Sequence, residues 1–231
     1  EILKIILSSI YKLNIVSFSL DDFYKTLNER KKLSKLIHPL LKTRGAPGTH
    51  DDIVLLKIIK KLKNKKFKKV TIPKFDKSKD DRFKRNFWQK ITKKPDIIIF
   101  EGWCVGAKPQ NKKDLKRPIN QLEKKEDIKL TWRKKINNEL NTNYKKIFKL
   151  VDYKIFIKAP SFNHVFKWRL LQEKKLGMKS KNKNIMKTNQ VKRFIMFYER
   201  ITKNMIKNFK DNDIIINLNT NHKIKSLIIN D

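Results

Sequence analysis

The sequence predicts an α/β fold, with a mostly parallel sheet covered by helices on both faces. Four short segments are rich in β-branched and aromatic residues and nearly continuous in apolar character, as expected of strands that are buried on both sides. Helical patterns lie between these segments, and strands that alternate with helices favour a parallel sheet. The chain has 231 residues, of which 39% are apolar, enough for a single domain with a substantial core.

The elements follow one another along the chain. The predicted strands cover residues 14–20, 95–100, 153–159 and 212–218, with a shorter strand near 69–73. The predicted helices cover residues 1–13, 131–150, 161–177 and 189–209. In the first helix, Ile2, Ile6 and Ile10 fall on one face. The best candidate for a mobile segment is the lysine- and asparagine-rich stretch 175–190.

The net charge of +36 allows two interpretations. A strongly basic chain is typical of nucleic-acid-binding proteins. However, the chain has 49 Lys and only 9 Arg, with 21 Asn and 3 Ala. This skew follows A/T-rich codons, and the lysines are spread along the whole chain, so drift in base composition is the favoured explanation. We therefore expect no specific nucleic-acid partner.

Other features of the composition indicate a protein of the cytoplasm. No apolar run approaches the roughly 18 residues of a membrane span, and no secretory signal peptide is present. Cys104 is the single cysteine, which excludes an internal disulfide and favours a reducing compartment. We therefore expect no membrane partner.

Acidic residues follow two of the predicted strands. Asp21 and Asp22 come directly after the first strand, and Glu101 follows the strand at 95–100. Ligands of α/β sheets bind at the carboxyl ends of the strands, so these carboxylates are candidate functional groups. A helix cap explains one of the two adjacent acids but not both. Glu101 suits a Mg²⁺ site, either directly or through water.

Two polar loops are also candidates. The stretch 38–52, "HPLLKTRGAPGTHDD", holds two of the five glycines, two of the seven prolines and two of the four histidines. The second loop, 72–82, reads "IPKFDKSKDDR", and its Asp76 and Arg82 are candidates to face a small polar substrate. The alternative for 38–52 is an ordinary surface turn, and the lysines of 72–82 fit solvated side chains.

These stretches carry a resemblance to a known family. In order along the chain, "SLDDFY", "HPLLKTRGAPGTHD", "IPKFDKSKDDR", "FEGWCVG", "WRLLQE" and "FYERIT" resemble the glycerate kinase family of P-loop kinases. That family is related to uridine kinase, phosphoribulokinase and pantothenate kinase. The match runs from residue 1 to about residue 209. It implies a P-loop NTPase-type three-layer sandwich with a helical lid.

The resemblance also implies roles for particular residues. Asp21 matches the general base, and Arg169 of "WRLLQE" matches a lid arginine that offsets charge on the transferring phosphoryl group. Asp22 and Glu101 would organise Mg²⁺, although the sequence leaves open which of Asp21 and Asp22 is the base. The residues implied to bind the phosphate acceptor are Tyr24, Arg44, His50, Asp51, Asp76 and Arg82.

One departure from the family pattern is clear. Residues 1–231 contain no G-x-x-x-x-G-K-[ST] sequence, the loop that holds nucleotide phosphates. In the family this loop directly precedes a helix like that of residues 1–13. We therefore expect residues 1–231 to form a single P-loop kinase domain without its first strand and phosphate-binding loop, and to be inactive without them.

The resulting functional prediction is an ATP-dependent kinase that uses Mg²⁺ and phosphorylates a small acceptor such as D-glycerate. An arginine fork suits the carboxylate of such an acceptor. The alternatives are a P-loop kinase for another hydroxylated metabolite and, from a different class, a basic nucleic-acid-binding protein.

Overall fold

The structure, a computed structural model, describes residues 2–179 and 185–230. Residues 180–184 of the stretch 175–190, for which mobility is predicted, lie outside the described part. The chain divides into two compact units. The first consists of Glu1–Val105 and Thr131–Leu150, and the second of Gly106–Leu130 and Val151–Asp231. Both units combine helices with strands, which confirms the predicted α/β class.

The first unit contains five helices, six strands and four single-turn segments among the described residues. Its helices are α1 (Ile2–Ile10), α2 (Leu27–Leu36), α3 (Asp52–Lys63), α6 (Thr131–Glu139) and α7 (Lys145–Phe148). Its strands are β1 (Ile15–Ser19), β2 (Val70–Ile72), β3 (Phe75–Asp76), β4 (Asp81–Arg82), β5 (Gln89–Ile91) and β6 (Ile97–Glu101). Its short turns are η1 (Leu20–Phe23), η2 (Pro39–Lys42), η3 (Arg85–Phe87) and η4 (Leu140–Tyr144).

The parallel pair β1–β6 positions the candidate site. Its register sets Ile15 opposite Ile97 and Ser19 opposite Glu101, so both strands end at the same edge. Continuous runs of Ile, Val and Phe explain why these segments become strands, because β-branched and aromatic side chains pack well on a pleated surface. In the first unit this parallel pairing involves two strands, while β2–β5 and β3–β4 are antiparallel pairs.

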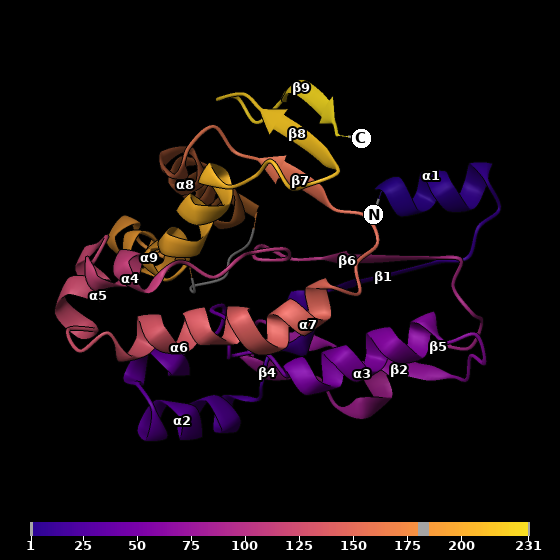
Figure 1. The fold of residues 1–231 in the computed structure, drawn as a ribbon, viewed down its shortest axis with the longest axis horizontal. Coiled ribbons are helices and arrows are strands. Elements are labelled where there is room, and N and C mark those ends of the chain that lie inside the picture. Colours follow the sequence, from indigo (N-terminus) through magenta and orange to yellow (C-terminus); the bar gives the residue numbers. More distant parts are fainter. Residues whose placement is uncertain (1, 180–184, 231) are drawn as a thin grey trace. The chain divides into compact units, whose positions relative to one another are not determined.

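The core of the first unit lies around α3. This helix contacts α7, η4, β2 and η1, and α6 and α7 follow one another beside it in Figure 1. Leu55 and Leu62 of α3 are buried, as are Trp132 of α6, Ile147 of α7 and Leu20 of η1. Burying a side chain of this size contributes about 1.5–3 kcal/mol. The core therefore fixes the segment that follows β1.

Two predicted helices of the first unit differ from those observed. The helix predicted for 1–13 ends at Ile10, because Lys12 adopts a left-handed conformation with φ 55° and the chain turns toward β1. The helix predicted for 131–150 is interrupted by a π-helical turn, η4, and ends at Phe148.

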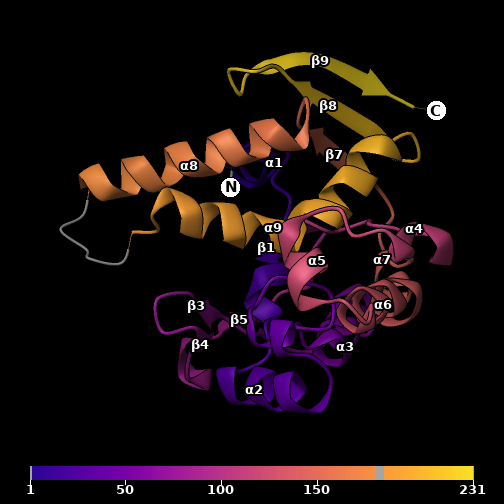
Figure 2. The same ribbon diagram turned by 90° about the vertical axis from the view of Figure 1, so that its left-hand side faces the viewer.

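The second unit is built from helices and a three-stranded sheet. Its elements are α4 (Lys112–Lys116), α5 (Gln121–Glu126), β7 (Ile155–Lys158), α8 (Phe162–Lys179), α9 (Thr188–Lys207), β8 (Ile214–Leu218) and β9 (Ile224–Ile229). β8 pairs in parallel with β7 and antiparallel with β9. Figure 2 shows α8 and α9 as two long helices side by side, and the two are in contact. Among the described residues, no helix has the length and apolar character needed to cross a membrane.

A buried ion pair joins α5 to α9. Arg200 donates to both carboxylate oxygens of Glu123, at 2.7 and 2.6 Å, and also to the carbonyls of Asp114 and Arg117. The Glu123 side chain is fully buried and that of Arg200 is 6% exposed. This pair has no local signal in the sequence, because its partners lie 77 positions apart.

We expect Arg200→Met to lower the free energy of unfolding by about 3–5 kcal/mol, because the buried Glu123 carboxylate would lose the two hydrogen bonds and the charge of this guanidinium. Chemical denaturation checks this value. The double variant Arg200→Met with Glu123→Leu should recover most of the loss, since the buried carboxylate is removed together with its guanidinium partner. A double variant as unstable as the single one would contradict the explanation.

Candidate active site

The candidate site begins where β1 ends. Ser19 caps η1: its hydroxyl accepts a hydrogen bond from the Asp21 amide at 3.2 Å, and its own amide donates to Asp22 Oδ2 at 3.2 Å. This reciprocal cap accounts for Asp22, one of the two adjacent acids. Burial raises the pKa of Asp22 above its ordinary value, although the amides of Ser19 and Phe75 act against it. Asp21 takes no part in the cap with its side chain.

The Asp21 carboxylate is held by two other side chains. Tyr24 donates its hydroxyl to Oδ1 at 2.7 Å, and Lys77 donates its ammonium to Oδ2 at 2.7 Å. Burial alone raises the pKa of Asp21, but the hydrogen bonds from Lys77 and Tyr24 outweigh it and hold that pKa below its usual value. Asp21 is therefore ionised at neutral pH and has a fixed orientation.

His50 lies behind Tyr24. The two rings stack with centroids 4.4 Å apart, and a backbone bridge joins the two residues. Tyr144 Oη accepts from the Gly48 amide at 3.2 Å and lies 2.6 Å from His50 Nδ1, so its hydroxyl hydrogen is free to point at that nitrogen. This arrangement assigns the imidazole proton to Nε2. Burial lowers the pKa of His50 to about 3, so the ring is neutral.

The series of contacts from Asp21 through Tyr24 ends at His50 Nε2. The imidazole is fully buried, and Nε2 has no hydrogen-bond partner among the described residues. A buried donor without a partner carries a free-energy cost of about 1–3 kcal/mol. Such a group is accordingly a candidate to bind a ligand oxygen.

Arg82 ties the β3–β4 hairpin to the same site. Its Nε donates to the Tyr24 carbonyl at 2.7 Å, and its Nη2 lies 3.0 Å from Asp51 Oδ2. Asp51 also caps α3 by accepting from the Val54 amide at 3.2 Å. The structure therefore brings Asp21, Tyr24, His50, Asp51 and Arg82 into one connected network.

Asp76 and Arg44 lie on the outer side of this network. Asp76 Oδ1 accepts from the Ser78 amide at 2.9 Å and the Ser78 hydroxyl at 2.5 Å, and so shapes the turn of the hairpin. Arg44 is paired with Asp80, and its guanidinium carbon lies 5.6 Å from the centre of the Phe75 ring. Phe75 in turn packs edge-on against Tyr24, with ring centroids 5.2 Å apart.

Arg169 belongs to the second unit. It lies on α8, pairs with Glu173 and donates to Gln172 Oε1 at 2.7 Å. Its guanidinium carbon lies 5.4 Å from the centre of the Phe194 ring on α9. The Nε atom is buried and has no hydrogen-bond partner in the described part of the chain. These contacts of Arg169 are thus all with residues of α8 and α9.

The carboxylates at the strand ends fit a particular kind of Mg²⁺ site. No cluster of three or more His, Cys, Asp or Glu that could hold a metal ion occurs among residues 2–179 and 185–230. Asp22 is bonded to Ser19, and Ser19 lies opposite Glu101 in the β1–β6 register. Mg²⁺ at a nucleotide site is commonly bound by one or two carboxylates together with phosphates and water. Asp22 and Glu101 fit that arrangement.

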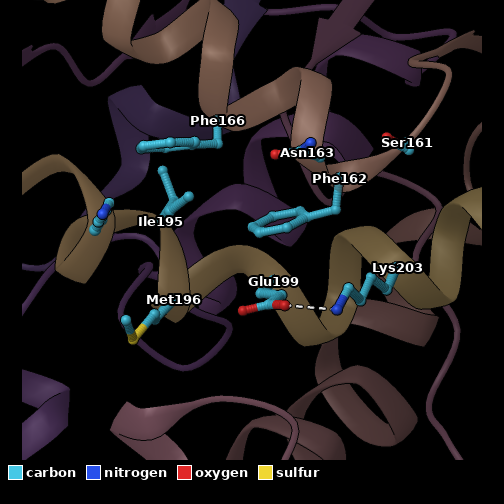
Figure 3. A pocket seen from close by; sticks show the side chains of 9 residues that line it. Ser161, Phe162, Asn163, Phe166, Ile195, Met196, Glu199 and Lys203 are labelled. Atoms are coloured by element: carbon cyan, nitrogen blue, oxygen red, sulfur yellow. Dashed lines mark ion pairs between the residues drawn. The ribbon is translucent and has the colours of Figure 1, made fainter. Parts of the chain in front are cut away.

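The second unit also contains a cavity of about 550 Å³ between α8 and α9 (Figure 3). The rings of Phe162 and Phe166 project into it from α8, with Ile195 and Met196 facing them from α9. The Glu199–Lys203 ion pair, 2.6 Å long, lies along its side. None of the predicted site residues lines this cavity.

Sequence reasoning missed two residues of the network. The sequence is consistent with a solvated Lys77, yet its ammonium contacts Asp21 across 56 positions of sequence. Tyr144 lies in a segment predicted only as helix and contacts His50 across 94 positions. The one sequence signal for Lys77 was its place beside Asp76 in a candidate loop, and Tyr144 carried none.

Comparison with known proteins identifies relatives of this chain. No protein-family model matches the chain. Over 193 residues it is 34% identical to the uncharacterized kinase mug58 of Schizosaccharomyces pombe, a match of 80% of the chain and 68% of that protein. Over 191 residues it is 29% identical to the chloroplastic D-glycerate 3-kinase of Arabidopsis thaliana, a match of 79% of the chain and 39% of that protein. The chain thus spans well under half of this second relative.

A solved structure of a kinase is also similar to this chain. D-glycerate 3-kinase from Cryptococcus neoformans var. grubii superposes with a TM-score of 0.81 at 26% identity, covering 97% of this chain and 82% of that one. The similarity to mug58 reaches across most of both sequences, and each of these relatives bears the name of a kinase. The chain therefore belongs to the family of ATP-dependent kinases that includes D-glycerate 3-kinase.

Proposed function

We propose that this chain forms the acceptor-binding part of a kinase that transfers the γ-phosphate of MgATP to a hydroxyl group of D-glycerate. The observation that carries the proposal is the Asp21 carboxylate, ionised and oriented at the end of β1 by Tyr24 and Lys77. Family membership and the names of the relatives support the reaction class and the acceptor.

Asp21 acts as the general base. Each of its oxygens accepts one hydrogen bond, which leaves a lone pair on each for the acceptor hydroxyl. As the acceptor oxygen attacks the γ-phosphorus, Asp21 takes its proton, and the bond from phosphorus to the departing ADP oxygen breaks. General-base assistance of this kind contributes about 10²- to 10⁴-fold in rate.

The neighbouring residues bind and orient the acceptor. His50 offers a neutral Nε2–H donor that keeps its hydrogen across the physiological pH range, because burial lowers the pKa of the ring to about 3. By the family resemblance, Arg44 is assigned to acceptor binding, and its guanidinium is paired with Asp80. Arg82 and Asp51 hold Tyr24 in place, and Asp76 presents its carboxylate from the hairpin turn.

The phosphates of the nucleotide are assigned to residues other than those that bind the acceptor. Mg²⁺, when bound, offsets negative charge on the phosphates. Asp22 and Glu101 would hold it at the common end of β1 and β6. By the family resemblance, Arg169 is assigned to the charge that develops on the transferring phosphoryl group.

The proposed fold is the P-loop sandwich, with a wider parallel sheet than the β1–β6 pair alone. Among the described residues, β6 has one unpaired edge, and parallel sheets of two strands are rarely stable by themselves. α1 buries none of its residues, and Ile2, Ile5 and Ile10 are 74%, 55% and 66% exposed. Both features favour a further strand packed beside β6 and α1, and by the family resemblance a phosphate-binding loop would join that strand to α1.

A panel of acceptors tests the proposed function. In a protein that joins a phosphate-binding loop to this chain, we expect MgATP-dependent ADP release with D-glycerate to exceed that with uridine, pantothenate or ribulose 5-phosphate. Omission of Mg²⁺ should abolish the activity. Turnover of one of the other acceptors with no response to D-glycerate would reject the assigned acceptor while leaving the kinase class in place.

A further inference from the structure

We propose that Lys77 binds the carboxylate of an anionic acceptor beside Asp21 and thereby selects small hydroxy acids over neutral polyols. This inference rests on the proposed function, since it concerns how the acceptor meets the base. It assigns a role to a residue outside the set that the sequence indicated.

An anionic acceptor and the general base carry charges of the same sign. An acceptor such as a hydroxy acid is an anion, and the carboxylate that must take its proton is also negative. Two negative charges a few ångströms apart repel each other, and a cation between or beside them offsets this repulsion. A site for an anionic acceptor therefore needs positive charge in direct contact with the base.

Lys77 is the cation that contacts Asp21. Its Nζ lies 2.7 Å from Asp21 Oδ2, and its side chain remains 62% exposed. An ammonium group has three N–H donors. The contact with Asp21 uses one of them, and the exposure leaves the others accessible to a ligand that approaches Asp21 from solvent. Lys77 is thus placed to bridge the base and an acceptor carboxylate.

The hairpin that carries Lys77 is firmly built. Asp76 closes the turn through its bonds to Ser78, and Asp80 adopts a left-handed conformation with φ 54°. Arg30, whose side chain is fully buried, donates to the Asp80 carbonyl at 2.6 Å and lies 2.9 Å from its carboxylate. The backbone around Lys77 is therefore anchored even though its side chain is exposed.

The arginines near the site have other partners. Arg82 uses Nε on the Tyr24 carbonyl and Nη2 on Asp51, while Arg44 is paired with Asp80. Each of these cations is matched to a carboxylate other than the base. Lys77 differs because its carboxylate partner is Asp21 itself. Loss of Lys77 would therefore expose an anionic acceptor directly to the charge of Asp21.

Charge selectivity is the measurable consequence. D-glycerate and glycerol have similar size and both offer hydroxyl groups, but only D-glycerate is an anion. In the protein that joins a phosphate-binding loop to this chain, we expect Lys77→Met to lower kcat/KM for D-glycerate by about 10- to 100-fold, the size of one hydrogen bond to a charged group. The value for glycerol should change far less, so the preference for D-glycerate over glycerol should shrink. Lys77→Arg should keep the preference.

The matched control is Lys79→Met. This substitution removes another exposed lysine from the same turn, and with it one positive charge, as Lys77→Met does. It should leave both kcat/KM values unchanged. Thermal unfolding should show that Lys77→Met folds like the wild type, as expected for a side chain that is 62% exposed. Titration of D-glycerate into each protein without ATP provides a second readout that does not depend on turnover.

The outcomes separate this inference from the proposed function. If Lys77→Met weakens D-glycerate and glycerol turnover equally, Lys77 merely orients Asp21 and the inference is wrong, while the kinase function stands. The same holds if the variant binds D-glycerate as tightly as the wild type. If the loop-containing protein without substitutions neither binds nor phosphorylates D-glycerate, the proposed function and this inference both fail.

Discussion

Replacement of Asp21 by asparagine is expected to lower kcat by about 10²- to 10⁴-fold, the usual contribution of a general base. The amide has the same size as the carboxylate and still accepts a hydrogen bond from Tyr24. It has no basic oxygen to take the acceptor proton and no charge to pair with Lys77. The affinity for ATP should stay nearly unchanged, because Asp21 has no assigned contact with the nucleotide.

The test uses steady-state kinetics in a protein that carries a phosphate-binding loop, with ATP affinity measured separately by titration. Asp211→Asn is the matched control, since Asp211 is an exposed aspartate of the second unit that is likewise paired with a lysine, Lys108. It should keep the wild-type kcat. A near-normal kcat in Asp21→Asn would show that the base is another group.

Steady-state kinetics also distinguish the roles of Asp21 and Asp22. Asp22 accepts the Ser19 amide, and asparagine preserves such an acceptor, so Asp22→Asn should retain the cap of η1. If Asp22 serves the metal, its variant should need more Mg²⁺ to reach half-maximal rate. Asp21→Asn should need no more than the wild type.

The strands were predictable from the sequence because their signal is local. The apolar runs that became β1 and β6 are bounded by polar residues; β6 ends in Glu101, and Asp21 and Asp22 follow β1 in η1 at the same edge. Periodicity likewise located α8 and α9 to within a few residues. In each case the side-chain pattern that forms the element lies inside the element.

The contacts that build the candidate site were less predictable, because they join distant segments. The partner of His50 is Tyr144, and the partner of Asp21 is Lys77. In a chain with 49 lysines, only its place beside Asp76 in a candidate loop distinguishes Lys77 from those that are merely solvated. Its role depends on the β3–β4 hairpin, whose two-residue strands are too short to leave a periodic pattern.

The second large effect concerns the nucleotide. Residues 1–231 contain no G-x-x-x-x-G-K-[ST] sequence, whose backbone amides and lysine hold the β- and γ-phosphates in P-loop kinases. We expect this chain to bind MgATP about 10²- to 10⁴-fold more weakly than a protein in which such a loop precedes α1. That range corresponds to two missing hydrogen bonds to charged groups at about 1.5–3 kcal/mol each.

Isothermal titration of both proteins with MgATP measures the difference, and the ADP-release assay should detect turnover only in the longer protein. The control is the longer protein with the lysine of the added loop changed to alanine, which restores the strand but not the full phosphate contact. If the added strand packs beside β6 and α1, this control should unfold at a higher temperature than residues 1–231 while still binding MgATP poorly. Tight stoichiometric binding of MgATP by residues 1–231 alone would mean that the phosphates are held by groups other than a P-loop, and the proposed nucleotide site would then be wrong.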